Sequence, residues 1–283
     1  MIDLHAHTTA SDGSLFPREL VELAKKTGIT ALGITDHDTV DGIDEALRAG
    51  KEEGLDIVPG LEFSAEYEPG TMHILGYDID PAYQPLLDEL AKRRHDRDER
   101  NPKIIRALQT MGLGITIEEV AAAAGGDVVG RPHIGKVLVE KGHASSVSDA
   151  FARYLDKGRP AFVRQEKIAP PRAIELITKA GGVATLAHPY QTKLTADSLE
   201  RLVEQLVGQG LQGIEVYYSR HTPEMIGHYQ AIARHYDLVE TGGSDFHGAP
   251  KPDIRLGTGV GNLKVPKDVL PRLRERKQRI CRT

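Results

Sequence analysis

Apolar and polar positions follow two patterns that alternate along most of the chain. Short apolar runs are followed by stretches whose apolar residues recur at helical spacing, which predicts consecutive strand-helix units around a parallel sheet. The predicted strands cover 2–7, 29–35, 57–64, 72–79, 183–189, 211–218 and 238–248. The predicted helices between and after them cover 17–28, 41–53, 86–100, 170–182, 196–210, 223–237 and 266–278. This order predicts an α/β fold, a closed or nearly closed barrel of seven parallel strands.

Residues 101–165 break this rhythm. Asn101-Pro102 is expected to end the charged helix before it, and the segment GRPHIGKVLVEKG then predicts a helix from Pro132, followed by another at 147–156. We therefore predict a helical insertion at 101–165 within a barrel formed by 1–100 and 166–283.

The charge of the insertion differs from that of the barrel. It carries nine Lys and Arg against six Asp and Glu, whereas the remainder carries 27 against 35. A basic cap over an acidic floor suits an anionic substrate. The alternative is a solvated helical surface whose excess charge has no role.

Composition narrows the class of protein. The chain has no apolar run of about 18 residues and no basic and apolar leader, so we expect a cytoplasmic protein without a membrane association. Its one cysteine, Cys281, excludes an intrachain disulfide framework and thiolate metal sites. A net charge of −5 does not favour binding to duplex DNA, although small or single-stranded ligands stay open. Nothing in the sequence indicates a protein partner.

Six of the seven predicted strands supply candidate ligands, which are histidines and carboxylates that lie within the strand or just after it. Because the carboxyl ends of parallel strands meet at one rim, we expect these side chains to converge there. His5 and His7 would lie on the same side of an extended segment. Asp36 and Asp38 flank one histidine and are expected to support the ligands or to lie on the surface, without binding metal. The predicted metal ligands are His5, His7, Asp12, His37, Glu62, His73, His188, Asp245 and His247.

This donor set indicates the type of metal. Imidazole and carboxylate together, without sulfur, favour Mn²⁺ over Ca²⁺ or Mg²⁺, with Fe²⁺ and Zn²⁺ as alternatives. Nine ligands are too many for one ion, and they suffice for two or three divalent ions when water completes each shell and Glu62 bridges two of them.

Four further residues are candidates for substrate contacts. His221 follows the sixth strand and could donate a proton to a leaving oxygen or bind phosphate, or it could be a structural loop residue. Arg131 stands at the start of a predicted helix, where free amide groups and a guanidinium suit phosphate. His133 and Lys136 follow it within the same helix and could assist. A helix cap on the surface is the alternative for this segment.

The order of the motifs resembles the PHP family, named for polymerase and histidinol phosphatase domains. The chain presents HAH, SDG, TDHD, a Glu, a further His, AHP and SDFH in that order, and all nine predicted ligands match. The resemblance implies a distorted seven-stranded barrel with a site for two or three metal ions. The segments GRPHIGKVLVEKG and YYSRHT are similar to stand-alone members, which include 3',5'-nucleotide bisphosphate phosphatases and exonucleases that act on short RNA.

We therefore expect a metal-dependent phosphoesterase that removes the 3'-phosphate of a 3',5'-nucleotide bisphosphate, such as adenosine 3',5'-bisphosphate to AMP. An exoribonuclease acting on short RNA and a histidinol-phosphate-type phosphatase are the alternatives. A metal-dependent amide hydrolase is disfavoured, because no lysine follows the third, fourth or fifth strand to bridge the metals. A binding protein on a retired scaffold would lack part of the ligand set, which is intact here.

Overall fold

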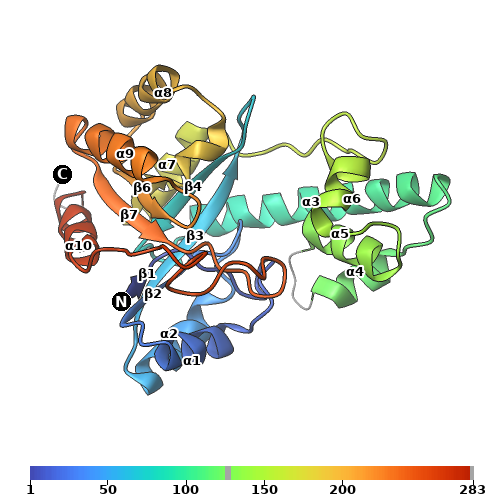
Figure 1. Ribbon diagram of the computed structural model, residues 1–283, viewed down its shortest axis with the longest axis horizontal. Coiled ribbons are helices and arrows are strands. Elements are labelled where there is room, and N and C mark those ends of the chain that lie inside the picture. Colours follow the sequence, from blue (N-terminus) through green and yellow to red (C-terminus); the bar gives the residue numbers. More distant parts are fainter. Residues whose placement is uncertain (125–128, 281–283) are drawn as a thin grey trace.

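Seven strands curl into a nearly closed barrel in the computed structural model, which describes residues 1–124 and 129–280 (Figure 1). Cys281 lies outside this range. The strands are β1 (Ile2–Asp3), β2 (Ala31–Ile34), β3 (Asp56–Ala65), β4 (Met72–Tyr77), β5 (Val183–Leu186), β6 (Gly213–Tyr218) and β7 (Val239–Gly243), and they neighbour one another in this order. The extended chain after β1 returns to the exit of β7, where His7 N donates to Phe246 O at 2.9 Å. This contact closes the barrel, so the predicted distorted seven-stranded barrel is confirmed.

The prediction of an all-parallel sheet was wrong at β4. β1, β2 and β3 are parallel, and so are β5, β6 and β7, but β4 runs antiparallel to both of its neighbours. Residues 66–71 join β3 to β4, and this link is too short for the helical crossover that parallel neighbours need, so the two strands form a hairpin.

Alternate residues of each strand face the inside of the barrel and the helices outside it. In β4, Leu75 and Tyr77 pack within the inner cluster, whereas Met72 and Ile74 pack against the surrounding helices. The inner cluster also contains apolar residues of α10 (Val269–Ile280), which therefore covers one end of the barrel. The opposite end of the barrel is not covered by α10, so polar side chains can lie there.

The other barrel helices form the outer layer (Figure 1). They are α1 (Pro17–Lys26), α2 (Ile43–Glu53), α7 (Pro170–Lys179), α8 (Ala196–Gly208) and α9 (Pro223–His235), and a 3₁₀ turn covers Pro189–Thr192. Proline opens α1, α7 and α9, where its missing N–H leaves no helical bond unmade. No helix in 1–124 or 129–280 is long and apolar enough to cross a membrane.

The helix predicted to end before Asn101-Pro102 instead continues as α3 (Gln84–Thr110). An internal proline costs about 3 kcal/mol, and packing on both sides of it offsets that cost. Leu86 and Leu90 belong to the barrel core, whereas Ile104 and Leu108 belong to a separate core. The expected boundary at residue 101 therefore falls inside one helix.

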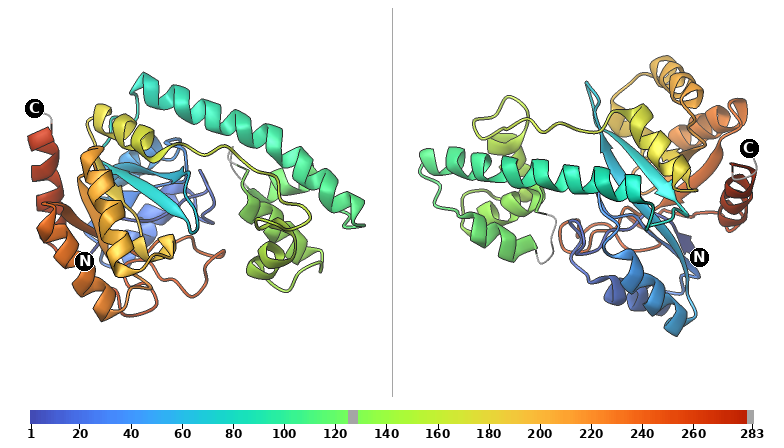
Figure 2. Two further views of the ribbon diagram at one scale, coloured as in Figure 1. Left: turned by 90° about the horizontal axis from the view of Figure 1, so that it is seen from above. Right: turned by 180° about the vertical axis from the view of Figure 1, so that it is seen from behind.

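That separate core is built entirely from residues 104–161. It joins the second half of α3 to α4 (Ile117–Ala124), α5 (Arg131–Glu140), α6 (Val147–Ala150) and a π-helical turn at Phe151–Leu155. Figure 2 shows α3 running from the barrel to this group of helices, with the segment after the π-helical turn returning beside it.

Candidate metal centre

Glu62 lies at the centre of the predicted ligand set. It sits on the inner face of β3 and is completely buried. Its Oε2 lies 3.2 Å from ring nitrogens of three histidines, and its Oε1 lies 2.8 and 2.9 Å from those of two more: His5, His7 and His37 in the first set, and His73 and His188 in the second. The predicted ligands therefore converge at one rim around this carboxylate, although His73 reaches it from the start of the antiparallel β4 and not from a strand exit.

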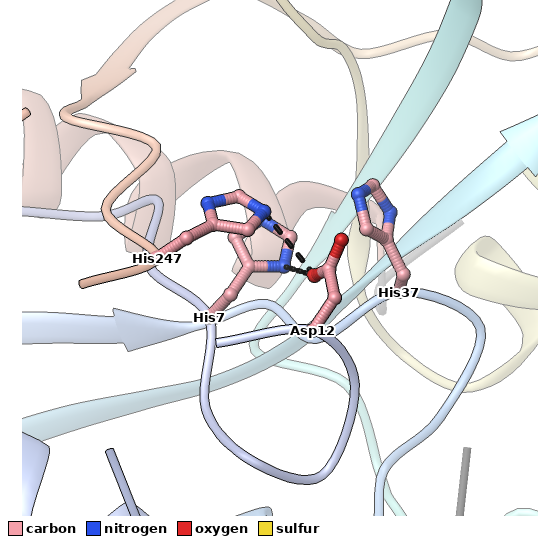
Figure 3. Close-up of side chains that lie close together, drawn as sticks. All are labelled: His7, Asp12, His37 and His247. Atoms are coloured by element: carbon pink, nitrogen blue, oxygen red, sulfur yellow. Dashed lines mark ion pairs between the residues drawn. The ribbon is translucent and has the colours of Figure 1, made fainter. Parts of the chain in front are cut away.

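Asp12 and Asp245 complete the cluster. Asp12 Oδ1 lies 3.2 Å from His247 Nε2 and 3.7 Å from His7 Nδ1, and Figure 3 shows these rings and His37 around the carboxylate. Asp245 Oδ1 lies 3.3 Å from His7 Nε2 on the other side.

Eight of the nine predicted ligands fall into three groups, each with its donor atoms within 4.8 Å of one another: His7, Asp12, His37 and His247; His5, His7, Glu62 and Asp245; and His37, Glu62 and His73. His188 belongs to none of these groups and contacts the cluster through Glu62. This arrangement fits two or three metal ions sharing ligands.

The state of four of these donors, His7, His37, Glu62 and His73, also fits bound metal. His7 Nε2 and His37 Nδ1 are buried and make no hydrogen bond, a costly state unless another partner occupies the space between the side chains. Burial lowers the pKa of His73 to about 4, so its ring is neutral near pH 7. Burial alone would raise the pKa of Glu62, but His37 and His73 hold it well below its usual range, which keeps the carboxylate ionised. Neutral imidazole and ionised carboxylate are the forms that bind metal.

Hydrogen bonds hold the carboxylate-bearing loops in place. Asp36 accepts from Thr8 N and from the hydroxyls of Thr8 and Ser11, at 2.6 to 2.7 Å, and thereby shapes the loop that carries Asp12. Asp38 accepts from Ser64 N at 3.0 Å and pairs with Arg97. Both acids lie outside the three donor groups, as the sequence predicted.

The outer oxygen of Asp245 is fixed from the opposite side. Its Oδ2 accepts from the Tyr218 hydroxyl at 2.8 Å and from Lys251 Nζ at 2.7 Å. Burial would raise the pKa of Asp245, yet Lys251 and His247 hold it well below its usual range. Its inner oxygen is thereby left facing the histidines as an ionised donor.

A cavity of about 220 Å³ opens beside these donors and extends toward α3 and α5. Asp12, His37 and His73 line it on the barrel side. The facing wall is basic: it carries Arg93 and Arg97, which pair with acids, and three cations with no carboxylate within 4.0 Å in the described parts of the chain, namely Arg100, Arg131 and Lys167. A metal-binding floor and a cationic wall therefore share one space.

The sequence matches the PHP domain family over residues 3–163, which is more than half of the chain. The chain belongs to the PHP family. It is 36% identical over 269 residues to a 5'-3' exoribonuclease of Haemophilus influenzae, covering 95% of this chain and 96% of that protein. It is 32% identical over 283 residues to a 3',5'-nucleoside bisphosphate phosphatase of Chromobacterium violaceum, covering 99% and 98%.

The fold agrees with this family. A crystal structure from Bifidobacterium adolescentis, assigned as a metal-dependent phosphoesterase, matches the chain with a TM-score of 0.86 at 33% identity, covering 97% of this chain and 95% of that one. The protein is thus a metal-dependent phosphoesterase of the PHP type.

Of the three insertion residues predicted to contact substrate, two line the cavity beside the metal centre. Arg131 lines the cavity, with its guanidinium 5.7 Å from the centre of the Phe151 ring and 5.9 Å from that of Phe162. His133 lines it as well, and its Nδ1 accepts from Gly130 N at 3.0 Å.

Lys136 does not reach the cavity. Its side chain is half exposed, and its Nζ donates to Ala123 O at 3.3 Å and lies 4.0 Å from Glu140. The lysine lies one helical turn beyond Pro132 and His133, about 5 Å further along the axis of α5, and this places it past the residues that line the cavity. The prediction that it contacts substrate has no support in the structure.

His221, predicted as a proton donor, lies behind the metal centre. Its ring packs against Tyr190, Tyr218 and Tyr229, its Nδ1–H donates to Val216 O at 2.8 Å, and it does not line the cavity. Burial lowers its pKa to about 4, which leaves no proton to donate from Nε2 near neutral pH. These contacts indicate a structural loop histidine, the alternative that the sequence left open.

Sequence reasoning missed two parts of the site. The cavity wall takes Arg97 and Arg100 from the charged helix predicted at 86–100, to which no role was assigned, and both are buried. Their spacing of three residues places them on one face of α3, a signal that a helical projection of the charges would have revealed. Glu215 was also missed, although a lone acid inside the apolar strand GIEVYY marks an inward-facing charge.

Proposed function

We propose that this phosphoesterase hydrolyses the 3'-phosphate ester of nucleotides that carry a 5'-phosphate, with 3',5'-nucleotide bisphosphates as substrates. The observation that carries the proposal is the single cavity shared by the metal-binding side chains and the three cations without carboxylate partners. Two separate sites for anions, side by side, suit a small molecule with two phosphates. In this proposal the helical insertion at 101–165 acts as a substrate cap, because it contributes Arg131 and His133 to the wall.

The cationic wall would bind the phosphate that is not cleaved. Burial, followed by repulsion from Arg131 and Arg97, lowers the pKa of Arg100 to about 9, and burial also lowers the pKa of Lys167. A phosphate dianion would relieve this repulsion and accept hydrogen bonds from both groups. Because His133 Nδ1 accepts from Gly130, the neutral ring carries its proton on Nε2 and can donate to the same anion.

The nine rim residues would hold two or three divalent ions, for which we propose Mn²⁺. Such ions, when bound, lower the pKa of water and offset the charge on a phosphoryl group and its leaving oxygen. The residues of the chain orient the substrate: the wall fixes the 5'-phosphate, and this sets which ester reaches the metal-binding rim.

A second candidate function is hydrolysis of the same phosphorus–oxygen bond in a longer substrate. A 5'-3' exoribonuclease that releases 5'-mononucleotides also breaks the bond between phosphorus and the 3'-oxygen, and differs only in having further nucleotides on that phosphate. The 36% identity to such an enzyme of H. influenzae favours this activity on short RNA. The histidinol-phosphate alternative is less favoured, because a substrate with one phosphate leaves the three cations of the wall unpaired.

The test is phosphate and nucleotide release from four substrates with Mn²⁺: a 3',5'-bisphosphate, a 3'-mononucleotide, histidinol phosphate and a 5'-phosphorylated RNA trimer. We expect the bisphosphate to be turned over with the highest kcat/KM. Lys167→Met should raise KM for the bisphosphate about tenfold, because a charge-assisted hydrogen bond is lost. The KM for the 3'-mononucleotide should stay nearly unchanged.

Lys136→Met is the matched control, since this lysine lies on the insertion outside the cavity. Equal effects of Lys167→Met on both nucleotides would contradict the second phosphate site. Preference for the trimer would favour the exoribonuclease, and preference for histidinol phosphate would overturn both nucleotide readings.

A further inference from the structure

Glu215 is a completely buried carboxylate on β6, the one strand whose exit supplies none of the nine predicted ligands. It pairs in register with Thr241 of β7, and both side chains point into the barrel. A buried carboxylate is costly unless its oxygens accept hydrogen bonds. Its partners therefore indicate its role.

The first oxygen of Glu215 contacts His5. Oε1 lies 2.9 Å from His5 Nδ1, while Nε2 of the same ring lies 3.2 Å from Glu62 Oε2 within the donor cluster. When Nδ1–H donates to Glu215, the lone pair of His5 is on Nε2 and faces the metal-binding side. Glu215 thus selects the tautomer and the ring orientation that a metal requires.

The second oxygen holds the backbone of His188. Oε2 accepts from His188 N at 2.8 Å. His188 has a φ of +24°, a conformation that residues with a side chain rarely adopt, and surrounding contacts must hold it. Its ring delivers Nε2 to within 2.9 Å of Glu62 Oε1. One carboxylate therefore fixes two histidines from strands on different sides of the barrel.

We propose that Glu215 is a positioning residue of the metal centre, which sets metal affinity by fixing His5 and His188 without binding an ion itself. It belongs to none of the three donor groups, because both of its oxygens face hydrogen-bond donors. Carboxylates that orient a ligating histidine in this way commonly contribute about 10- to 100-fold in metal affinity. The inference rests on the proposed metal centre.

The test is Glu215→Gln, which keeps the size of the side chain but has one acceptor oxygen where the structure needs two. The Mn²⁺ dissociation constant is measured on metal-free protein by calorimetry, and the Mn²⁺ concentration for half-maximal activity is measured alongside. We expect both to rise about 10- to 100-fold. At saturating Mn²⁺, KM for the nucleotide should stay within about twofold of wild type, because the cationic wall is untouched.

Glu240→Gln is the matched control. Glu240 lies on the neighbouring β7 but accepts from the Tyr217 hydroxyl at 2.7 Å, outside the barrel interior. The Glu240→Gln variant should have the wild-type Mn²⁺ dissociation constant and the wild-type Mn²⁺ concentration for half-maximal activity. A merely structural role for Glu215 would lower the melting temperature of the metal-free variant and leave the Mn²⁺ constants within about twofold of wild type, and that result would overturn the proposal.

If Glu215→Gln does not fold, Glu215→Asp replaces it under the same criteria, because it keeps both oxygens but is one methylene shorter. If the wild-type protein binds no Mn²⁺, the result contradicts the proposed metal centre itself and not only the proposed role of Glu215. If wild type binds Mn²⁺ but does not hydrolyse nucleotides, the metal constants still decide the role of Glu215.

Discussion

His7 shows how one side chain joins two parts of the metal centre. Its Nε2 lies 3.2 Å from Glu62 and 3.3 Å from Asp245, whereas its Nδ1 lies 3.7 Å from Asp12. Asp12 approaches only the second of these environments, on the cavity side. The metal centre therefore contains distinct donor groups, and one of them includes Asp12 whereas another includes Asp245.

We expect Asp12→Asn to lose about one bound ion while the group of His5, His7, Glu62 and Asp245 stays filled, since its donors are unchanged. Metal content by mass spectrometry on protein purified with Mn²⁺ checks this. Asp41→Asn, which removes an exposed carboxylate near Arg94, is the control and should retain every ion. Loss of all metal from Asp12→Asn would show that the groups fill only together.

At the scale of elements, α3 couples two hydrophobic cores. Its first half packs on the barrel and its second half on the insertion, and Asn101 Nδ2 donates to Val129 O at 2.7 Å just before α5. The insertion has its own core, so its stability can change without that of the barrel. The cationic wall depends on both, because α3 and α5 each supply part of it.

Leu138→Ala should destabilise the insertion selectively. Leu138 is completely buried in the insertion core, and a leucine-to-alanine cavity costs about 2–5 kcal/mol. We expect faster hydrogen exchange in α4 and α5, a raised KM for the bisphosphate and unchanged Mn²⁺ binding. Leu206→Ala, at a buried position of α8 in the barrel core, is the control and should leave exchange in the insertion unaffected. If Leu138→Ala accelerated hydrogen exchange in the barrel as much as in the insertion, the two cores would unfold together.

At the scale of the whole molecule, the metal centre joins segments from both ends of the chain. Residues 5–12 meet residues 245–247, and β3 and β4 supply the middle of the cluster. A ligand that binds only this assembled state stabilises the entire barrel by mass action.

Mn²⁺ should therefore raise the melting temperature of metal-free protein. Each site at 100 times its Kd adds about 2.7 kcal/mol, which corresponds to several degrees for a chain of this size. Thermal scans with Mn²⁺, Mg²⁺ and no metal check this, and Mg²⁺ should have the smaller effect because it disfavours imidazole ligands. Asp245→Ala should lose most of the Mn²⁺ effect together with activity. An unchanged Mn²⁺ effect in that variant would exclude Asp245 from the centre.

The sequence by itself determined the number and order of the strands and the set of residues that converge at the rim. Strand and helix periodicities are local, and parallel strands with short exits carry their terminal residues to one edge whatever the details of packing. For this reason His5, Glu62 and Asp245, far apart in the chain, could be predicted to meet.

Tertiary structure decided the rest. Packing on two cores kept α3 continuous through Pro102, and a short connection reversed β4. The same folding placed Arg97 and Arg100 of the charged helix in the cavity wall, and placed Glu215 behind His5 and His188. These roles depend on which distant segment faces each side chain, and no periodicity within one segment carries that information.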